Sequence, residues 1–306
     1  MDTPIVRIEN LSHRYSVQWA VRDINLEIRQ HGIYGLLGSN GAGKSTIMNI
    51  MCGVLKQTEG DIYIKGINTR IDPVEAKCHI GFLPQQPPLH PDLTVEEYLD
   101  YSARLRYIPH KEIPAAITEV VEKCGISHFR KRLIRNLSGE YQQRVGIAQA
   151  IIHNPDFIIL DEPTNGLDPN QIVEIRNLIK QIAQERTVIL STHILPEVQA
   201  TCEYIYMVEK GKMVFSGTVD EFDNYILPTT IRVTLLAHPT VEELTMIPGL
   251  VAAQHLGEMD YRLQFADARN MVDEIIETCG IHNWRLSQIY MEKSSLDVVF
   301  AELSKK

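Results

Sequence analysis

The chain has 306 residues, 44% of them hydrophobic and 23% charged, and its formal net charge is −9. This composition is typical of a folded protein and excludes disorder as the main state. The length fits two domains, or one large domain with an appendage. The excess of acidic residues argues against broad binding to nucleic acid, because contact with a phosphate backbone needs clustered cations.

The five cysteines are widely spaced, and no Cys-x-x-Cys pair occurs. This spacing argues against a disulfide framework or a zinc site and favours a reducing compartment, such as the cytoplasm. No segment approaches the roughly 18 uninterrupted apolar residues that a spanning helix needs, and the first residues lack the pattern of a secretory signal. We therefore expect any role at a membrane to depend on a partner protein.

Short apolar or alternating segments predict the strands in the first two thirds of the chain. Strict alternation predicts two antiparallel strands, at residues 5–11 and 21–28. Further strands are predicted at 33–37, 61–64, 80–83, 157–160 and 187–190. Helical spacing of apolar residues predicts helices at 46–55 and 171–184. Short strands that alternate with helices indicate an α/β fold with a mostly parallel sheet covered on both faces.

Two parts of the chain depart from this alternation. Residues 87–152 are rich in helical periodicity and predict a helical insertion within the α/β domain. Near Pro228 the pattern is interrupted, so we expect one domain over 1–225 and a small α+β domain of ferredoxin-like type over 226–306. Its predicted strands are at 231–236, 251–256, 261–265 and 284–290, and its predicted helices at 241–245, 268–279 and 296–303.

A glycine-rich loop between a predicted buried strand and a predicted helix fits the pattern G-x-x-x-x-G-K-[ST]. It consists of Gly38, Ser39, Asn40, Gly41, Ala42, Gly43, Lys44 and Ser45. The glycines allow backbone N–H groups to turn inward, and the start of the helix attracts anions. We expect Lys44 to contact the β- and γ-phosphates, Ser45 to offer its hydroxyl to Mg²⁺ and Thr46 to lie near the α-phosphate. A glycine-rich turn that binds nothing is the alternative, which the strand–loop–helix context disfavours.

Two acids, Asp161 and Glu162, follow the apolar strand predicted at 157–160. Ligands bind at the carboxyl ends of strands in an open α/β sheet. We expect Asp161 to hold Mg²⁺, directly or through water, and Glu162 to orient or deprotonate an attacking water. The alternative is a pair of solvated acids at the end of a strand.

From about residue 4 to residue 221, the chain resembles the ATP-binding cassette of ABC transporters, because several further motifs follow in that family's order. Tyr15 matches the aromatic residue that stacks on adenine, and Gln85 matches the glutamine between the core and the helical subdomain. Residues 137–144 occupy the place of the family signature, 166–169 match the loop after the acid pair, and His193 matches the switch histidine. The resemblance implies a P-loop NTPase of ABC type, with an antiparallel β subdomain and a helical insertion.

The resemblance also implies roles for these residues. Glu162, His193 and Gln85 would be catalytic, and Gln85 would also reach Mg²⁺ or water. Tyr15 as a plain core residue stays the alternative to an adenine contact, and Trp19 is a nearby substitute for it.

In this family two cassettes enclose two ATP molecules, so each site is built from both chains. The resemblance implies that Ser138, Gly139 and Asp168 contact the nucleotide held by a second cassette, in a homodimer or a close heterodimer. It further implies a transmembrane permease, gripped through the Pro-rich segment at 86–93. The chain would then be cytoplasmic and peripheral on the inner face of the cell membrane.

The signature departs from the family's usual Leu-Ser-Gly-Gly-Gln, because Glu140 and Tyr141 hold its last two positions. A carboxylate near a triphosphate repels it unless the carboxylate points away or meets a cation. We expect Glu140 to turn toward solvent in the first turn of a helix, where the dipole favours an acid. The alternative is a weakened signature that works opposite a different cassette.

The sequence therefore predicts an ATP-binding and ATP-hydrolysing subunit of an ABC transporter, and we expect an exporter with ATP and Mg²⁺ as cofactors and no nucleic acid partner. Residues 166–176 and 191–195 also resemble the bacterial ATP-binding subunit linked to gliding motility. One alternative is a soluble cassette protein that acts in translation or repair, although the chain has a single cassette and no sustained heptads. A nucleotide-gated interaction module is the other, and the set of Asp161, Glu162 and His193 argues against it.

Overall fold

The structure is a computed structural model of the chain, and it describes residues 3–225, 229–266, 270–292 and 303. Contacts between residues divide the chain into two compact units, Met1–Val219 and Asp220–Lys306. Pro228, at the expected boundary, lies outside the described residues, as does all but Leu303 of the helix predicted at 296–303. Among the described residues, no helix is both long and apolar enough to cross a membrane.

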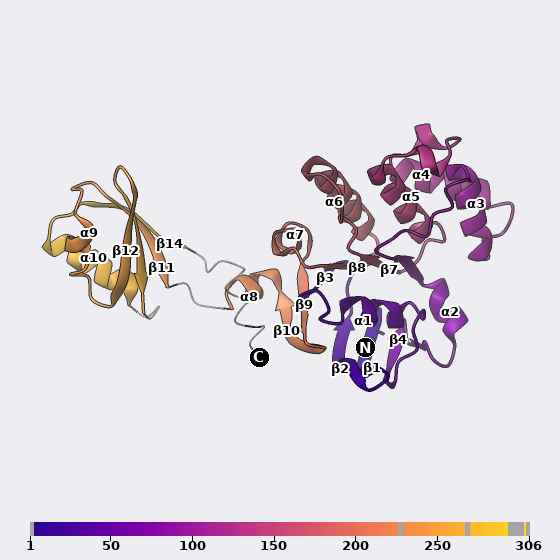
Figure 1. Cartoon of the computed structure of the whole chain (residues 1–306), viewed down its shortest axis with the longest axis horizontal. Coiled ribbons are helices and arrows are strands. Elements are labelled where there is room, and N and C mark those ends of the chain that lie inside the picture. Colours follow the sequence, from indigo (N-terminus) through magenta and orange to yellow (C-terminus); the bar gives the residue numbers. More distant parts are fainter. Residues whose placement is uncertain (1–2, 226–228, 267–269, 293–302, 304–306) are drawn as a thin grey trace. The chain divides into compact units, whose positions relative to one another are not determined.

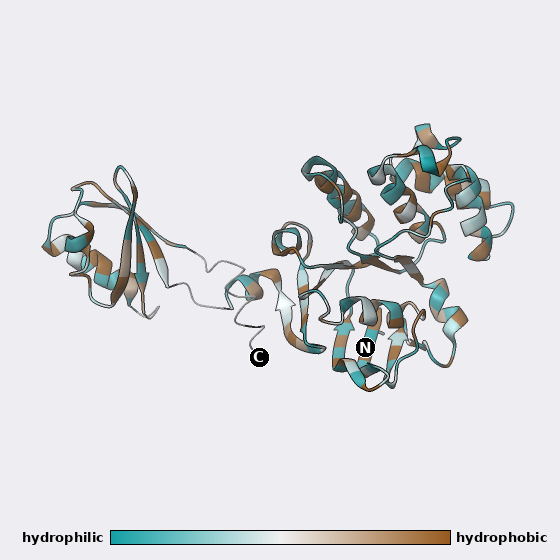
Figure 2. Ribbon diagram, viewed as in Figure 1, coloured by the Kyte–Doolittle hydropathy of each residue, from teal (hydrophilic) through white to brown (hydrophobic). Residues whose placement is uncertain are grey.

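A six-stranded sheet with the order β10-β9-β3-β8-β7-β6 forms the centre of the first unit (Figure 1). Its strands are β3 (Gly32–Leu37), β6 (Ile80–Leu83), β7 (Phe157–Asp161), β8 (Thr187–Thr192), β9 (Tyr204–Glu209) and β10 (Lys212–Thr218). Neighbouring strands are parallel except β10, which is antiparallel to β9. Every residue of β7 and β8 is buried, and Figure 2 shows hydrophobic residues along the central strands. The predicted mostly parallel sheet is confirmed.

A second sheet of the same unit is antiparallel and has the order β2-β1-β4-β5. Its strands are β1 (Val6–Tyr15), β2 (Gln18–Ile28), β4 (Glu59–Ile64) and β5 (Ile67–Asn68). The two strands predicted at the start of the chain are thus longer than expected and join in a hairpin where Tyr15 pairs with Gln18.

Helix α1 (Lys44–Met51) shares one hydrophobic core with strands of both sheets. Ile47, Met48, Ile50 and Met51 are at most 1% exposed, because the helix contacts β2 as well as β7. The helix begins and ends earlier than predicted. Gly53 adopts a φ of 63°, a left-handed conformation that ends helices, shortly after the last helical residue.

The predicted helical insertion consists of α3 (Val95–Leu105), α4 (Ile113–Lys123) and α5 (Gly139–Ile151), which contact one another (Figure 1). Thr94 and Glu97 form a capping box that fixes the start of α3. Helix α2 (Pro73–Cys78) was not predicted, although Asp72 caps it and proline holds its first position. The remaining helices of the first unit are α6 (Pro169–Ala183) and α7 (Leu195–Thr201), and α8 (Val219–Asp223) spans the boundary.

The second unit has the element order β-α-β-β-α-β and an antiparallel sheet with the order β12-β13-β11-β14. This is the ferredoxin-like arrangement that the sequence predicts. Its elements are β11 (Thr230–Leu235), α9 (Val241–Leu244), β12 (Leu250–Gly257), β13 (Asp260–Phe265), α10 (Met271–Ile281) and β14 (Leu286–Glu292). Alternate residues of β11 and β13 are buried in one core, which also contains Trp284.

Candidate functional site

The glycine-rich loop connects β3 to the N-terminus of α1, in the order that the sequence predicts. Close packing explains two of its glycines. A Cβ atom on Gly38 would lie 2.1 Å from the carbonyl oxygen of Val208. A Cβ atom on Gly43, whose φ is 111°, would lie 2.5 Å from Cγ1 of Val21. Any larger residue would clash at either position, so both must be glycine. Glycines at these positions let the loop backbone turn its N–H groups inward, as a loop that binds an anion requires.

Lys44 is buried, and its ammonium group lies inside the loop. Nζ donates hydrogen bonds to the carbonyl oxygens of Gly38 at 2.8 Å and Ser39 at 3.0 Å. Burial lowers the pKa of Lys44, while the negative charges of Glu162 and Asp161 oppose that shift. The loop thus holds a cation close to both acids that the sequence singles out.

Two residues that sequence reasoning missed support the loop from the end of β9. The Ser39 hydroxyl donates to the Glu209 carboxylate at 2.8 Å, and the Gly211 amide donates to the carbonyl oxygen of Ala42 at 3.0 Å. The sequence carried no signal for this contact, because Glu209 and Gly211 look like an ordinary turn between two strands.

Asp161 and Glu162 differ in their surroundings, although they are adjacent at the end of β7. Asp161 is buried, and its Oδ1 accepts a hydrogen bond from the Ser191 hydroxyl at 2.5 Å. The Glu162 amide donates to the same hydroxyl at 2.9 Å, so Ser191 fixes both acids. Glu162 has a φ of 48°, a strained value for a residue other than glycine. Such strain is typical of functional sites, where surrounding contacts hold it.

The Glu162 carboxylate gathers three side chains from three different segments. Gln85 donates from Nε2 to Oε2 at 2.9 Å, and Asn165 donates to the same oxygen at 3.3 Å. His193 Nδ1 lies 2.9 Å from Oε1. Asn165 is a residue that the sequence analysis did not single out. The structure thus brings Gln85, Glu162 and His193 together, as the resemblance implies.

These side chains and the loop face one cavity of about 460 Å³. The residues that line it are Asn40, Gly41, Gly43, Lys44, Ser45, Thr46, Gln85, Glu162, Asn165 and His193. The cationic side chain of Lys44 in the loop, the carboxylate of Glu162 and the imidazole of His193 thus line the same cavity. This arrangement suits a polyphosphate on the loop side and a water molecule on the carboxylate side.

The ring of Tyr15 is 53% exposed, which contradicts the alternative of a plain core residue. It packs edge-on against the His13 ring, with centroids 4.7 Å apart. Trp19, the possible substitute, instead has the guanidinium groups of Arg14 and Arg22 over its ring, each 5.7 Å from the centroid. Of these two aromatic rings at the hairpin, we therefore take the exposed ring of Tyr15 as the better candidate for contact with a base.

The residues expected to contact a second cassette do not line this cavity. Ser138 precedes helix α5, and its side chain makes no capping hydrogen bond, while Gly139 is the first residue of that helix. Asp168 caps α6 by accepting from the amides of Asn170 and Gln171, both at 3.0 Å. The predicted contacts of Ser138, Gly139 and Asp168 with a partner's nucleotide stay a prediction.

The expectation that Glu140 turns toward solvent is wrong. Its side chain is only 11% exposed, and its Oε1 accepts from Nε of Arg144 at 2.8 Å. Arg144 also pairs with Glu174 and donates to the carbonyl oxygen of Cys124 at 3.1 Å. The spacing of four residues on one helix made this pair possible, and burial of the guanidinium favoured it over a solvated acid. The charge of Glu140 is therefore met by a cation.

Tyr141, the other unusual residue of the signature, packs into the helical subdomain. Its ring lies edge-on to Phe129, with centroids 4.4 Å apart, and 5.9 Å from His128. Both departures from the family pattern thus fasten the start of α5 to neighbouring elements.

Comparisons with known proteins agree with this geometry. A family model described as ABC transporter matches residues 21–165. The bacitracin transport ATP-binding protein BcrA of Bacillus licheniformis is 39% identical over 212 residues, which are 69% of this chain and 68% of that protein. The linearmycin resistance ATP-binding protein LnrL of Bacillus subtilis is 28% identical over 305 residues, 98% of each protein.

A solved structure also matches. The ATP-binding cassette MJ0796, described as a dimer in a post-hydrolysis state bound to ADP and Pi, has a TM-score of 0.64 and 28% identity, and the match covers 70% of this chain and 98% of that one. The phosphate-binding loop, the acid pair and these similarities lead to one conclusion: the chain belongs to the ATP-binding proteins of the ABC transporter family and is an ATPase.

Proposed function

We propose that the chain is the ATP-hydrolysing subunit of an ABC exporter and drives a separate membrane subunit through ATP-dependent closure of two cassettes. The cavity that holds Lys44, Glu162 and His193 together carries this proposal. The relatives named for bacitracin transport and linearmycin resistance favour export. They do not favour the alternative of a soluble cassette protein in translation or repair. The narrower link to gliding motility and the absence of a nucleic acid partner stay predictions.

In this proposal the protein acts mainly by positioning, because phosphoryl transfer to water needs little covalent help. Lys44 and the backbone of the loop bind the phosphates, and Tyr15 stacks on adenine. Glu162 orients the attacking water and accepts its proton, while Gln85 and His193 hold the Glu162 carboxylate in place. His193 can also donate toward the γ-phosphate, since it lines the same cavity as Lys44.

Mg²⁺ fits this site because oxygen donors of the kind it prefers surround the cavity. Ser45 and Gln85 line the cavity, and Asp161 is a buried carboxylate with one hydroxyl partner, Ser191. These residues would hold the ion, directly or through water. The ion would neutralise charge on the phosphates as they react.

Closure requires a second cassette, and ATP must bind the closed pair more tightly than the open one. Ser138 and Gly139 suit this role, since an uncapped helix start presents N–H groups to an anion. Asp168 would contact the same nucleotide from its loop. The dimer described for MJ0796 supports this arrangement, and a homodimer and a heterodimer are both compatible with it.

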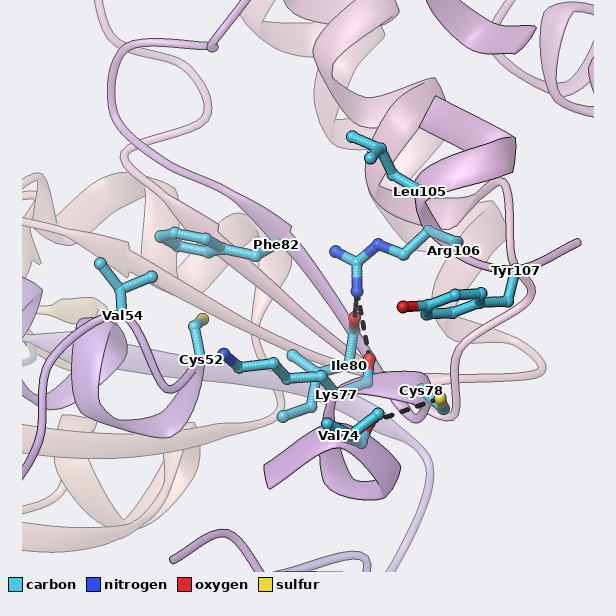
Figure 3. A pocket seen from close by; sticks show the side chains of 10 residues that line it. All are labelled: Cys52, Val54, Val74, Lys77, Cys78, Ile80, Phe82, Leu105, Arg106 and Tyr107. Atoms are coloured by element: carbon cyan, nitrogen blue, oxygen red, sulfur yellow. Dashed lines mark hydrogen bonds between the residues drawn. The ribbon is translucent and has the colours of Figure 1, made fainter. Parts of the chain in front are cut away.

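A groove of about 370 Å³ supports attachment to a membrane subunit (Figure 3). Its rim is apolar and open: Val54, Val74, Leu105 and Tyr107 are 60–82% exposed. Phe82, which also lines the groove, precedes Gln85 by three residues and the segment at 86–93, which the resemblance assigns to the permease, by four. A partner that binds in the groove and displaces Phe82 could therefore also displace Gln85, which is hydrogen-bonded to Glu162.

The charges in this groove indicate what fits it. Arg106 donates to the carbonyl oxygens of Lys77 at 3.1 Å and Ile80 at 3.3 Å, as Figure 3 shows. Within the described part of the chain, neither Arg106 nor Lys77 has a carboxylate within 4.0 Å. We therefore propose that the occupant is a helical segment of the membrane subunit with apolar residues and a carboxylate. Such attachment would place the chain on the inner face of the cell membrane.

Co-expression with a multi-span protein encoded beside this chain tests the proposal. We expect the two proteins to co-purify from detergent and Leu105→Glu to abolish co-purification, because a carboxylate would face the apolar segment. Basal ATPase activity of that variant should be retained. Val173→Glu is the matched control, since Val173 is 49% exposed on α6 and outside the groove. Co-purification of Leu105→Glu at the parent level would refute this docking site.

A further inference from the structure

Glu197 is a buried carboxylate that the mechanism above does not use. It lies in the first turn of α7 and is 8% exposed. Its carboxylate accepts hydrogen bonds from the Thr164 hydroxyl at 2.9 Å and the Thr192 hydroxyl at 3.1 Å. Within the described part of the chain, no cation lies within 4.0 Å of it, so these hydroxyls are what offsets its burial.

The two hydroxyls belong to the two segments that carry the catalytic pair. Thr164 lies two residues after Glu162, in the loop between β7 and α6. Thr192 is the last residue of β8 and directly precedes His193, and its hydroxyl also accepts from the Ile194 amide at 3.0 Å. Glu197 thus connects the backbone on either side of the contact between Glu162 and His193.

The loop that contains Thr164 is held from a second side. The buried side chain of Gln143, on helix α5, donates to the carbonyl oxygen of Pro163 at 2.8 Å. Helix α5 begins at Gly139, in the signature. The segment Pro163–Thr164 is therefore fixed between the signature helix and α7, with the strained residue Glu162 directly before it.

We propose that Glu197 is a positioning residue for ATP hydrolysis: its carboxylate clamps Thr164 to Thr192 and so keeps Glu162 and His193 in contact. A carboxylate suits this task because it only accepts hydrogen bonds: Oε2 lies 2.9 Å from the Thr164 hydroxyl and 3.1 Å from the Thr192 hydroxyl, and Oε1 also lies 2.9 Å from the Thr164 hydroxyl. An amide would replace one of these oxygens with a donor, and alanine would remove both. Loss of the clamp would leave the two hydroxyl protons without this acceptor and let the two segments separate, while the phosphate-binding loop keeps its own supports at Glu209 and Gly211.

Steady-state ATPase kinetics of the full chain, paired with fluorescent-ATP binding, test this proposal. We expect Glu197→Ala to lower kcat by about tenfold to a hundredfold, the loss that a misplaced catalytic group causes. The dissociation constant of the nucleotide should change less than about twofold, since the side chains bonded to the Glu197 carboxylate in the described part of the chain, Thr164 and Thr192, lie outside the loop. Glu197→Gln should fall between parent and alanine variant. Equal losses of binding and kcat would overturn the proposal.

Thr201→Val is the matched control for packing and folding. Thr201 lies on the same helix, is 9% exposed and lines the same small cavity as Glu197, yet it makes no hydrogen bond to Thr164 or Thr192. We expect it to change the melting temperature but not kcat. If Thr201→Val lowers kcat as much as Glu197→Ala, the effect is general loosening of α7 and the clamp is refuted.

A double-mutant cycle identifies the path of the effect. Thr164→Val with Thr192→Val removes both donors and should reproduce the loss in kcat, even if Glu197→Ala folds poorly. Adding Glu197→Ala to that background should lower kcat little further, because the clamp is already broken. Full additivity would contradict the clamp. A parent chain without ATPase activity would instead refute the hydrolytic function itself, so the two failures are distinguishable.

Discussion

Glu162 Oε1 and His193 Nδ1 lie 2.9 Å apart, and these residues follow two adjacent parallel strands, β7 and β8. The strands are in register through Asp161 and Ser191, so each side chain extends from the same edge of the sheet. A parallel sheet thus brings together residues that are 31 positions apart in the sequence.

Replacing the Glu162 carboxylate with an amide should separate binding from hydrolysis. We expect Glu162→Gln to bind ATP with parent affinity, to lose at least about 99% of the hydrolysis rate and to accumulate as an ATP-bound dimer. Size-exclusion chromatography with light scattering measures the dimer, and phosphate release measures the rate. Glu122→Gln, an exposed change on α4, is the control. Turnover at the parent rate would show that Glu162 does not activate the water.

The ion pair between Glu140 and Arg144 predicts a structural effect for a signature variant. Both side chains are 11% exposed, so Glu140→Ala, which removes one charged hydrogen bond, should lower the free energy of unfolding by about 1.5–3 kcal/mol. This destabilisation should be smaller than that caused by leaving a buried arginine without any partner, because Arg144 keeps its contacts with Glu174 and the Cys124 carbonyl oxygen. Urea unfolding measures it. A large gain in ATPase rate for Glu140→Gly would instead favour the weakened-signature alternative.

The exposure of Tyr15 predicts a base contact. Stacking of an aromatic ring on a base contributes about 1–3 kcal/mol. We expect Tyr15→Ala to raise the dissociation constant of ATP by about tenfold or more, and Tyr15→Trp to restore binding. Trp19→Ala should have a smaller effect, since the guanidinium groups of Arg14 and Arg22 lie over that ring. Calorimetric titration with ATP compares the three variants, and an equal loss for Trp19→Ala would reassign the contact.

His153 predicts a pH dependence of stability. Burial, together with the charge of Arg106, lowers the pKa of His153 to about 4, and Nε2 lies 3.0 Å from the carbonyl oxygen of Ile80. An unfolded histidine titrates near pH 6.5, so the unfolded chain binds the proton first. The contribution of His153 to stability is thus complete above about pH 6.5 and is lost as the pH falls from there toward about 4.

Urea unfolding at pH 7.5 and pH 5 measures this effect. We expect the parent to lose about 2 kcal/mol more than His153→Gln between pH 7.5 and pH 5, almost all of it below pH 6.5, since glutamine can also donate to Ile80 but does not titrate. The same decline in both proteins would assign the pH dependence to other groups.

The sequence predicted those parts of the site that local patterns specify. The loop at Gly38–Ser45 and the acids at Asp161 and Glu162 follow directly from short apolar strands, because strand ends of a parallel sheet meet at one edge. The ferredoxin-like order of the second unit followed from its alternating strand segments together with the helical segments between them. Helix α2 could have been predicted from Asp72 and Pro73, which form a standard helix start.

The rest depends on contacts between residues that are far apart in the sequence. Glu209 reaches Ser39 across 170 positions, and Glu197 reaches Thr164 across 33. No periodicity marks either residue. Glu140 was misjudged for a related reason: its exposure depends on whether Arg144 is buried against Cys124 and Glu174, and a helical pattern does not specify this.

The dependence of the glycine-rich loop on β9 has a consequence for biosynthesis. Gly38 packs against Val208, and the Ser39 hydroxyl bonds to Glu209, so a nascent chain that has emerged only as far as β8 contains the complete glycine-rich loop but lacks these contacts. We therefore expect the loop to reach its final conformation, and with it the capacity to bind nucleotide, only after β9 has been translated.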